Sequence, residues 1–232
     1  MVEKIEYIIL AGGFGTRLQS ISNNTPKALM PIGRTVYLDL LLEKILKNNL
    51  NHVYLSLHYK PELFHNYINN SIFKKRLKAV TEPKPLGTGG AINYVVESTN
   101  ISAPFFVLNG DSMSNIKLNK MYEEFLGQNL TAMIGITKVE DSERYGTVLT
   151  KDKKVISFEE KGNSCPGWIN NGHYIFKKEA FAGYSGAFSL EKTLFPKLVE
   201  NQELGAFKVE NDNFIDMGIP EDYEKLCIMH EA

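Results

Sequence analysis

Residues 5–18 read IEYIILAGGFGTRL, and this stretch decides the fold. Its first six residues are almost all apolar, and the run ends directly on Ala11-Gly12-Gly13-Phe14-Gly15. A short apolar run bounded by glycines predicts a buried strand that leads into a glycine loop. Glycines allow close approach to the backbone, and successive N–H groups in such a loop form an anion-binding concavity. Arg17 adds a planar cation that suits phosphate oxygens.

Other glycine loops fit this stretch less well. A dinucleotide fingerprint requires a third glycine where Leu18 stands, which argues against an NAD-dependent oxidoreductase. A Walker A loop requires Gly-Lys-Ser/Thr, which is absent here. A tight strand-to-helix turn with an incidental arginine is the structural alternative. Because Pro26-Lys27 supplies a second cation nearby, we favour a phosphate site.

Strands and helices alternate after the glycine loop. Strands are expected at 52–57, 77–81 and 105–108, and helices at 36–46, 61–68 and 91–97, from their apolar periodicity. Short connections between alternating elements predict a parallel α/β sheet with helices on both faces.

The pattern changes after about residue 130. Strand-like runs occupy 131–139, 146–149, 155–159 and 168–176, with a polar turn at 151–153. Helices are expected at 189–199 and 220–227, the second after a short strand near 214–215. No linker or repeat divides the chain, so we expect one domain over residues 1–232 with a mixed second half.

Composition excludes several functions. The chain has 232 residues with 26 basic and 27 acidic side chains, a net charge of -1, which lacks the broad basic field of nonspecific nucleic-acid or membrane binding. Cys165 and Cys227 follow no metal spacing and form no disulfide framework. The N-terminal apolar run is shorter than the core of a signal peptide, and we expect a cytoplasmic protein.

Two aspartates follow apolar strands. Asp111 ends FFVLNGD, and Asp216 lies in FIDMG. Carboxylates from two segments can share one Mg²⁺, which also binds waters and substrate phosphates. Each aspartate has an alternative role as a turn-capping residue. We predict a magnesium site on this pair.

Several motifs together carry a family resemblance. LAGGFGTRL, then TPKALMPI, EPKPLGTGGAI and LNGD, resemble the sugar-phosphate nucleotidyltransferase family. EEK, NNGHYIF, SLEKTLFPKL and FIDMGIPEDY also lie at the expected positions, so the resemblance spans nearly the whole chain. Within the family, the chain is most similar to the short heptose or mannose 1-phosphate guanylyltransferases.

The resemblance implies a Rossmann-like three-layer α/β/α sandwich with a predominantly parallel mixed central sheet. It implies a nucleotide-binding half over about 1–112 and a sugar-binding half over about 113–232. The implied reaction joins GTP and a sugar 1-phosphate into a GDP-sugar and pyrophosphate, with Mg²⁺, as a step in surface polysaccharide synthesis. A sugar 1-phosphate arrives mostly deprotonated, so the enzyme needs no general base and must position two anions and neutralise charge. The oligomeric state is left open, with a homodimer as one option.

The resemblance also implies individual roles. Arg17 contacts the triphosphate and stabilises the transition state, and Lys27 bridges the phosphates of nucleotide and sugar. The implied nucleotide-binding residues are Leu10, Ala11, Gly12, Gly13, Gly15, Thr16, Glu82, Pro85, Leu86, Gly87 and Thr88. The implied residues for the sugar phosphate are Gly110, Glu160, Lys161, Asn171, Gly172 and Glu191.

The sequence leaves the identity of the nucleobase and of the sugar undecided. A carboxylate at Glu82 can accept both donors of guanine, N1–H and the N2 amino group, but uracil and thymine also present a ring N–H. Thymidylyl, uridylyl or cytidylyl transfer to another hexose 1-phosphate is the alternative. His173 departs from many relatives and leaves the exact sugar undecided. A noncatalytic nucleotide-sugar-binding module is a further alternative, but it should lack Arg17, Lys27 or Asp111, and all three are present.

Overall fold

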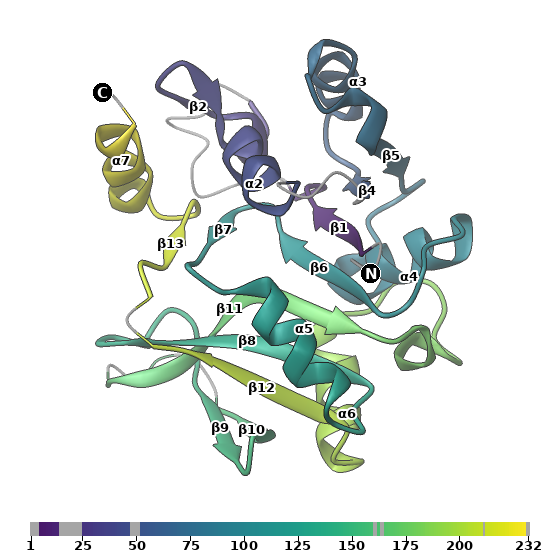
Figure 1. The fold of residues 1–232 in the computed structure, drawn as a ribbon, viewed down its shortest axis with the longest axis vertical. Helices are drawn as coiled ribbons and strands as arrows, with labels where there is room; N and C mark the ends of the chain where they lie inside the picture. Colours follow the sequence, from purple (N-terminus) through teal and green to yellow (C-terminus); the bar gives the residue numbers. More distant parts are fainter. Residues whose placement is uncertain are drawn as a thin grey trace.

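The computed structural model describes residues 5–13, 25–46, 52–159, 162, 165–210 and 212–230. In this part of the chain a nine-stranded sheet forms the centre, in the order β5-β4-β1-β6-β11-β8-β12-β10-β9 (Figure 1). Its strands are β1 (Glu6–Leu10), β4 (His52–Leu57), β5 (Leu77–Thr81), β6 (Phe105–Asn109), β8 (Ala132–Val139), β9 (Val148–Lys151), β10 (Lys154–Phe158), β11 (Gly167–Phe176) and β12 (Leu204–Val209).

Most strands of this sheet point the same way. β5, β4, β1 and β6 pair in parallel, β11 runs against them, and β8 and β12 return to the first direction. β10 pairs antiparallel with both β12 and β9, so only β10 and β11 are reversed. The mixed, predominantly parallel sheet that the sequence predicted is confirmed, and it runs without a break through both halves of the described chain.

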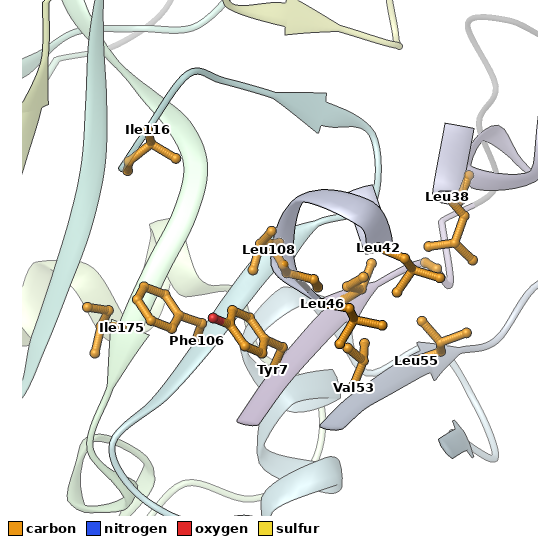
Figure 2. Packing of buried hydrophobic residues seen from close by; sticks show 14 of the residues in the cluster. Tyr7, Leu38, Leu42, Leu46, Val53, Leu55, Phe106, Leu108, Ile116 and Ile175 are labelled. Carbon is orange, nitrogen blue, oxygen red and sulfur yellow. The ribbon is translucent and has the colours of Figure 1, made fainter. Parts of the chain in front are cut away.

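Helices cover both faces of the sheet. They are α2 (Tyr37–Ile45), α3 (Pro61–Asn70), α4 (Gly87–Ser98), α5 (Leu118–Leu126), α6 (Phe195–Glu200) and α7 (Pro220–Met229). Tyr7 and Ile9 of β1 pack with α2, α3 and α5, whereas Ile8 packs with α4 and α6 on the opposite face. Figure 2 shows the first of these cores, in which Leu38, Leu42 and Leu46 of the α2 region lie over strand residues. Alternate side chains of a buried strand thus pack into the cores on the two faces of the sheet. The sheet and the helices on its two faces form a three-layer α/β/α sandwich.

Two short ribbons lie outside the large sheet. β7 (Ser112–Met113) pairs antiparallel with β13 (Ile215–Asp216), and β2 (Pro31–Ile32) pairs with β3 (Thr35–Val36). A third core, which includes Met217 and Leu226, packs α7 and β13 against α2. This packing places the C-terminal segment beside the first half of the chain (Figure 1).

Some predicted boundaries were wrong. The helix expected from residue 91 begins at Gly87, because the backbone carbonyl of Phe188 accepts the N–H groups of Gly89 and Gly90 and supports a glycine-rich first turn. The helix expected over 189–199 is a π-helical turn, Leu190–Leu194, followed by α6. Helix α5 and strand β12 were not anticipated.

Candidate functional site

A pocket of about 390 Å³ opens at the carboxyl ends of β1 and β6. It is lined by Leu10, Ala11, Gly12, Gly13, Lys27, Ala28, Ser56, His58, Glu82, Pro85, Gly87, Thr88, Ala91, Asn109, Gly110 and Asp111. β1 has β4 on one side and β6 on the other, so the strand order reverses here, where open α/β sheets bind ligands. Its lining includes eight of the eleven residues predicted to bind the nucleotide, namely Leu10, Ala11, Gly12, Gly13, Glu82, Pro85, Gly87 and Thr88.

The two strands approach closely at the pocket floor. The N–H of Gly110 donates to the carbonyl of Leu10 over 2.9 Å. A Cβ added to Gly110 would lie 2.5 Å from that oxygen, and one added to Gly12 would lie 2.9 Å from the backbone nitrogen of His58. Both glycines are therefore required by close contacts with neighbouring backbone, which sets the shape of the floor.

Lys27 and Asp111 form an ion pair beside this floor. The Lys27 ammonium lies 3.0 Å from Oδ2 of Asp111, with side chains 17% and 37% exposed. Lys27 begins the short 3₁₀ helix Lys27–Leu29, and the rigid Pro26 precedes it. A cation in the lining of this pocket suits the binding of an anionic substrate.

The ribbon β7–β13 brings Asp216 to the same place. Asp216 pairs with Ser112, next to Asp111, and the N–H of Met217 donates to the Asp111 carbonyl over 2.8 Å. A Cβ added to Gly218 would lie 2.8 Å from Oδ1 of Asp216 and 3.0 Å from the Lys27 ammonium, so these two groups are close to each other. The two distant aspartates and the lysine thus belong to one constellation.

Burial and the negative charge of this constellation raise the pKa values of two tyrosines. Burial, and then the charges of Asp111 and Asp216, hold the pKa of Tyr37 well above its ordinary value. Burial and the charges of Asp216 and Asp222 also raise the pKa of Tyr145, whose hydroxyl is hydrogen-bonded to Asp216. Both phenols therefore stay neutral, and each can act only as a neutral hydrogen-bonding group near the carboxylates.

The donor set fits a divalent cation. Within the described ranges no group of three or more histidine, cysteine or acidic residues could hold a metal by itself. Asp111 and Asp216 instead provide two carboxylates beside a pocket, which matches Mg²⁺ bound by one or two carboxylates and completed by water and phosphate oxygens.

Glu82 lies in the pocket wall with one oxygen without a partner. Its side chain is buried, and Oε2 has no hydrogen bond within the described residues. Burial raises the pKa of Glu82, against opposing effects of His58 and of a hydrogen bond from the Leu86 backbone. Sequence reasoning missed His58 and Ser56, which both line the pocket. Ser56 lies near the carboxyl end of β4 and His58 directly follows the strand, and this position was the signal for them.

The first turn of α4 joins the two halves of the chain. Gly87 and Thr88 line the pocket, and Leu86 is buried behind them. The Thr88 hydroxyl donates to Glu191 over 3.1 Å and accepts the N–H of Leu190 over 2.8 Å. Glu191, predicted for the sugar side, is therefore tied directly to a residue of the pocket.

Other predicted sugar-side residues lie elsewhere. Asn171 is fully buried and does not line the pocket. Gly172 has a φ of 78° and lies against the side chain of Asn109, a pocket residue. The imidazole of His173 is also buried, and burial lowers its pKa to about 3. Gly15, Thr16, Arg17, Glu160 and Lys161 fall outside the described residues.

A glycine-lined pocket with a fixed cation at this edge of the sheet is typical of α/β proteins that bind phosphate groups. More narrowly, the chain belongs to the nucleotidyl transferase family, whose sequence model matches residues 6–228. In the described part of the chain, no helix has the length and apolar character needed to cross a membrane.

Comparisons with individual proteins narrow the similarity further. The D-glycero-alpha-D-manno-heptose 1-phosphate guanylyltransferase of Aneurinibacillus thermoaerophilus is 35% identical over 95% of this chain and 96% of its own. The enzyme of the same name from Campylobacter jejuni is also 35% identical, over 97% of this chain and 99% of the Campylobacter enzyme. The crystal structure of HddC from Yersinia pseudotuberculosis complexed with GMP-PN superposes with a TM-score of 0.84 at 34% identity, covering 97% of this chain and 99% of that chain.

Proposed function

We propose that this chain transfers a guanylyl group from GTP to a heptose or mannose-type sugar 1-phosphate. An oxygen of the sugar phosphate attacks the α-phosphorus of GTP, the bond to the β-phosphate oxygen breaks, and pyrophosphate leaves. The observation that carries the proposal is the single pocket that joins the glycine loop, Lys27 with Asp111, and Glu82. The names and full-length similarity of the two heptose 1-phosphate guanylyltransferases support the same substrates.

The residues of the pocket have distinct parts in this reaction. The backbone at Leu10–Gly13 cradles the triphosphate, and the Lys27 ammonium faces the phosphates and offsets their charge. Asp111 and Asp216 would hold Mg²⁺, which neutralises phosphate charge when bound. Arg17, Gly15 and Thr16 complete the phosphate contacts in this proposal, and Glu160, Lys161 and Glu191 serve the sugar side.

Base selection is assigned to Glu82. Its unpartnered oxygen can accept a guanine N–H, whereas adenine offers only one exocyclic donor there and no ring N–H. The proposal includes a cytoplasmic location and a GDP-sugar product used by glycosyltransferases of surface polysaccharide synthesis. Cys165 and Cys227 are both free thiols, in keeping with a reducing compartment.

A substrate matrix tests the proposal. Purified protein is incubated with GTP, ATP, UTP, CTP or dTTP against heptose, mannose and glucose 1-phosphates, and pyrophosphate release is measured. We expect the highest kcat/KM with GTP and a heptose or mannose 1-phosphate. The variant Glu82→Gln should reduce the preference for GTP, because it replaces one acceptor oxygen with a donor. Dominant turnover with UTP or dTTP, and none with GTP, would show the guanylyl assignment to be wrong.

A further inference from the structure

The ribbon β7–β13 is too short to hold its own geometry. Each strand has two residues, yet the ribbon fixes the separation of Asp111 and Asp216. Isolated two-stranded pairs are at best marginally stable in water. A metal site on this pair therefore depends on contacts that hold the ribbon from outside.

Asp212 closes the end of the ribbon that is farther from the carboxylate pair. One of its oxygens accepts the Ser114 hydroxyl, and the other accepts the N–H of Asn115, both over 2.5 Å. The same Ser114 hydroxyl oxygen accepts the N–H of Ile116 over 3.2 Å. The two bonds to Asp212 join the segment after β7 to the segment before β13, and charge-assisted hydrogen bonds of this kind are the stronger ones.

Two further elements anchor Ser114 to the body of the protein. Lys44, near the end of α2, donates from its ammonium to the Ser114 carbonyl. Asn171 of β11 donates from Nδ2 to the Ser114 hydroxyl oxygen over 3.3 Å. Ser114 is 1% exposed and Asn171 is fully buried, so these bonds are shielded from water. We call Lys44, Ser114, Asn171 and Asp212 the ribbon clamp.

A local distortion of β11 delivers Asn171 to the ribbon clamp. The pairing of β11 with β8 shifts register between Asn170 and Tyr174, and Gly172 inside this bulge has a φ of 78°. Opposite the bulge, a Cβ added to Gly135 of β8 would lie 2.5 Å from Oδ1 of Asn171. A bulge can redirect a side chain in this way, and here the space at Gly135 accommodates it.

We propose that the ribbon clamp is a positioning device that sets the spacing of Asp111 and Asp216 for a divalent cation. The inference rests on the proposed metal role of this pair. The four residues of the ribbon clamp are positioning residues, because they act through the ribbon. In the contacts described above they touch neither the pocket lining nor the two carboxylates. Asn171 thereby has a role different from the sugar contact expected from the sequence.

Two measurements on Ser114→Ala and Asp212→Asn test the ribbon clamp. Mn²⁺ alone is titrated into the protein and followed by the electron paramagnetic resonance of the free ion. We expect about tenfold weaker Mn²⁺ binding, since removal of groups that orient metal ligands has effects of this size. Without any metal, amide hydrogen exchange at Met217 should become about tenfold faster, because its bond to Asp111 opens more often.

Ser102→Ala is the matched control. It removes the hydroxyl of an exposed serine that donates to the buried carboxylate of Glu6 over 2.9 Å, at the amino end of β1. A purely structural role predicts lower thermal stability in Ser114→Ala and Ser102→Ala alike, with unchanged Mn²⁺ affinity in both, and that result would overturn the clamp. Asp212 is half-buried, and Asn has the same shape as Asp. The variant Asp212→Asn can therefore still be measured if Ser114→Ala does not fold.

Asp111→Asn separates this inference from the proposed function. Loss of Mn²⁺ binding in Asp111→Asn, together with wild-type binding in both clamp variants, would refute the clamp and leave the metal pair intact. If the wild-type chain binds no Mn²⁺, or if Asp111→Asn binds it normally, the metal pair and the clamp are both wrong.

Discussion

Acid should destabilise this protein through His173. The imidazole is completely buried, and burial lowers its pKa from 6.5 to about 3, with a smaller effect from the charge of Lys44. Its Nδ1 lies 3.0 Å from the Asn171 carbonyl, while Nε2 has no partner among the described residues. The folded protein therefore keeps this histidine neutral at pH values where the unfolded chain protonates it.

The direction and size of this change in the free energy of unfolding follow from the linkage between proton binding and folding. The unfolded state binds the extra proton below pH 6.5, so the contribution is fully present above that pH and is lost as the pH falls toward 3. Between pH 7.5 and pH 5.0 this single group should lower the free energy of unfolding by about 2 kcal/mol. That loss is a sizeable part of the roughly 5–15 kcal/mol that stabilises a typical domain.

Urea unfolding at the two pH values measures the effect. His173→Asn replaces the imidazole with a group that does not titrate, so its stability should change by about 2 kcal/mol less than that of the wild type over the same interval. Asn substituted at His65, which is exposed on α3, is the matched control and should keep the wild-type pH dependence. Equal losses in wild type and His173→Asn would refute the reasoning.

Three further predictions concern the pocket. Gly110→Ala should lose about 1–3 kcal/mol in urea unfolding, because its Cβ would lie 2.5 Å from the backbone oxygen of Leu10 and the backbone would have to shift; wild-type stability would contradict the close approach. Lys27→Met should lower kcat by about 100-fold or more, yet alter stability by less than about 1 kcal/mol, since its ion pair is partly exposed; near-normal turnover would remove Lys27 from the mechanism. Treatment with EDTA should abolish pyrophosphate release, and excess Mg²⁺ should restore it; activity that persists in EDTA would reject a metal-dependent reaction.

The first half of the fold follows closely from sequence patterns. The β-rich runs His52–Leu57 and Leu77–Thr81 match observed strands. His52–Leu57 lies inside the sheet and is buried from Val53 onward, whereas Leu77–Thr81 is an edge strand in which only Leu77 is buried. Helix α5 was missed although Met121 and Phe125 lie four residues apart on one buried face, since their polar neighbours obscure the period. Strand β12 was missed because Gly205 and Lys208 interrupt its apolar pattern.

The candidate site was predictable to a different degree at each residue. Asp111 and Asp216 follow apolar strands, so their meeting at one edge could be expected, and the structure brings them together through β7 and β13. The burial of Asn171 could not be predicted, because it depends on a register shift in β11 and on the space at Gly135. Such features arise from pairing between distant strands, which single-sequence periodicity does not encode.

The position of β12 has a consequence for how the protein is made. β12 lies inside the sheet between β8 and β10, and β13 with α7 then packs back against the first half (Figure 1). Residues 204–229 are therefore synthesised after the other strands of the large sheet, yet they are needed for the carboxylate pair. Until they emerge, the nascent chain has an unpaired edge at β8 and only one of the two aspartates. The constellation of Lys27, Asp111 and Asp216 thus forms late, after nearly all of the described chain has been synthesised.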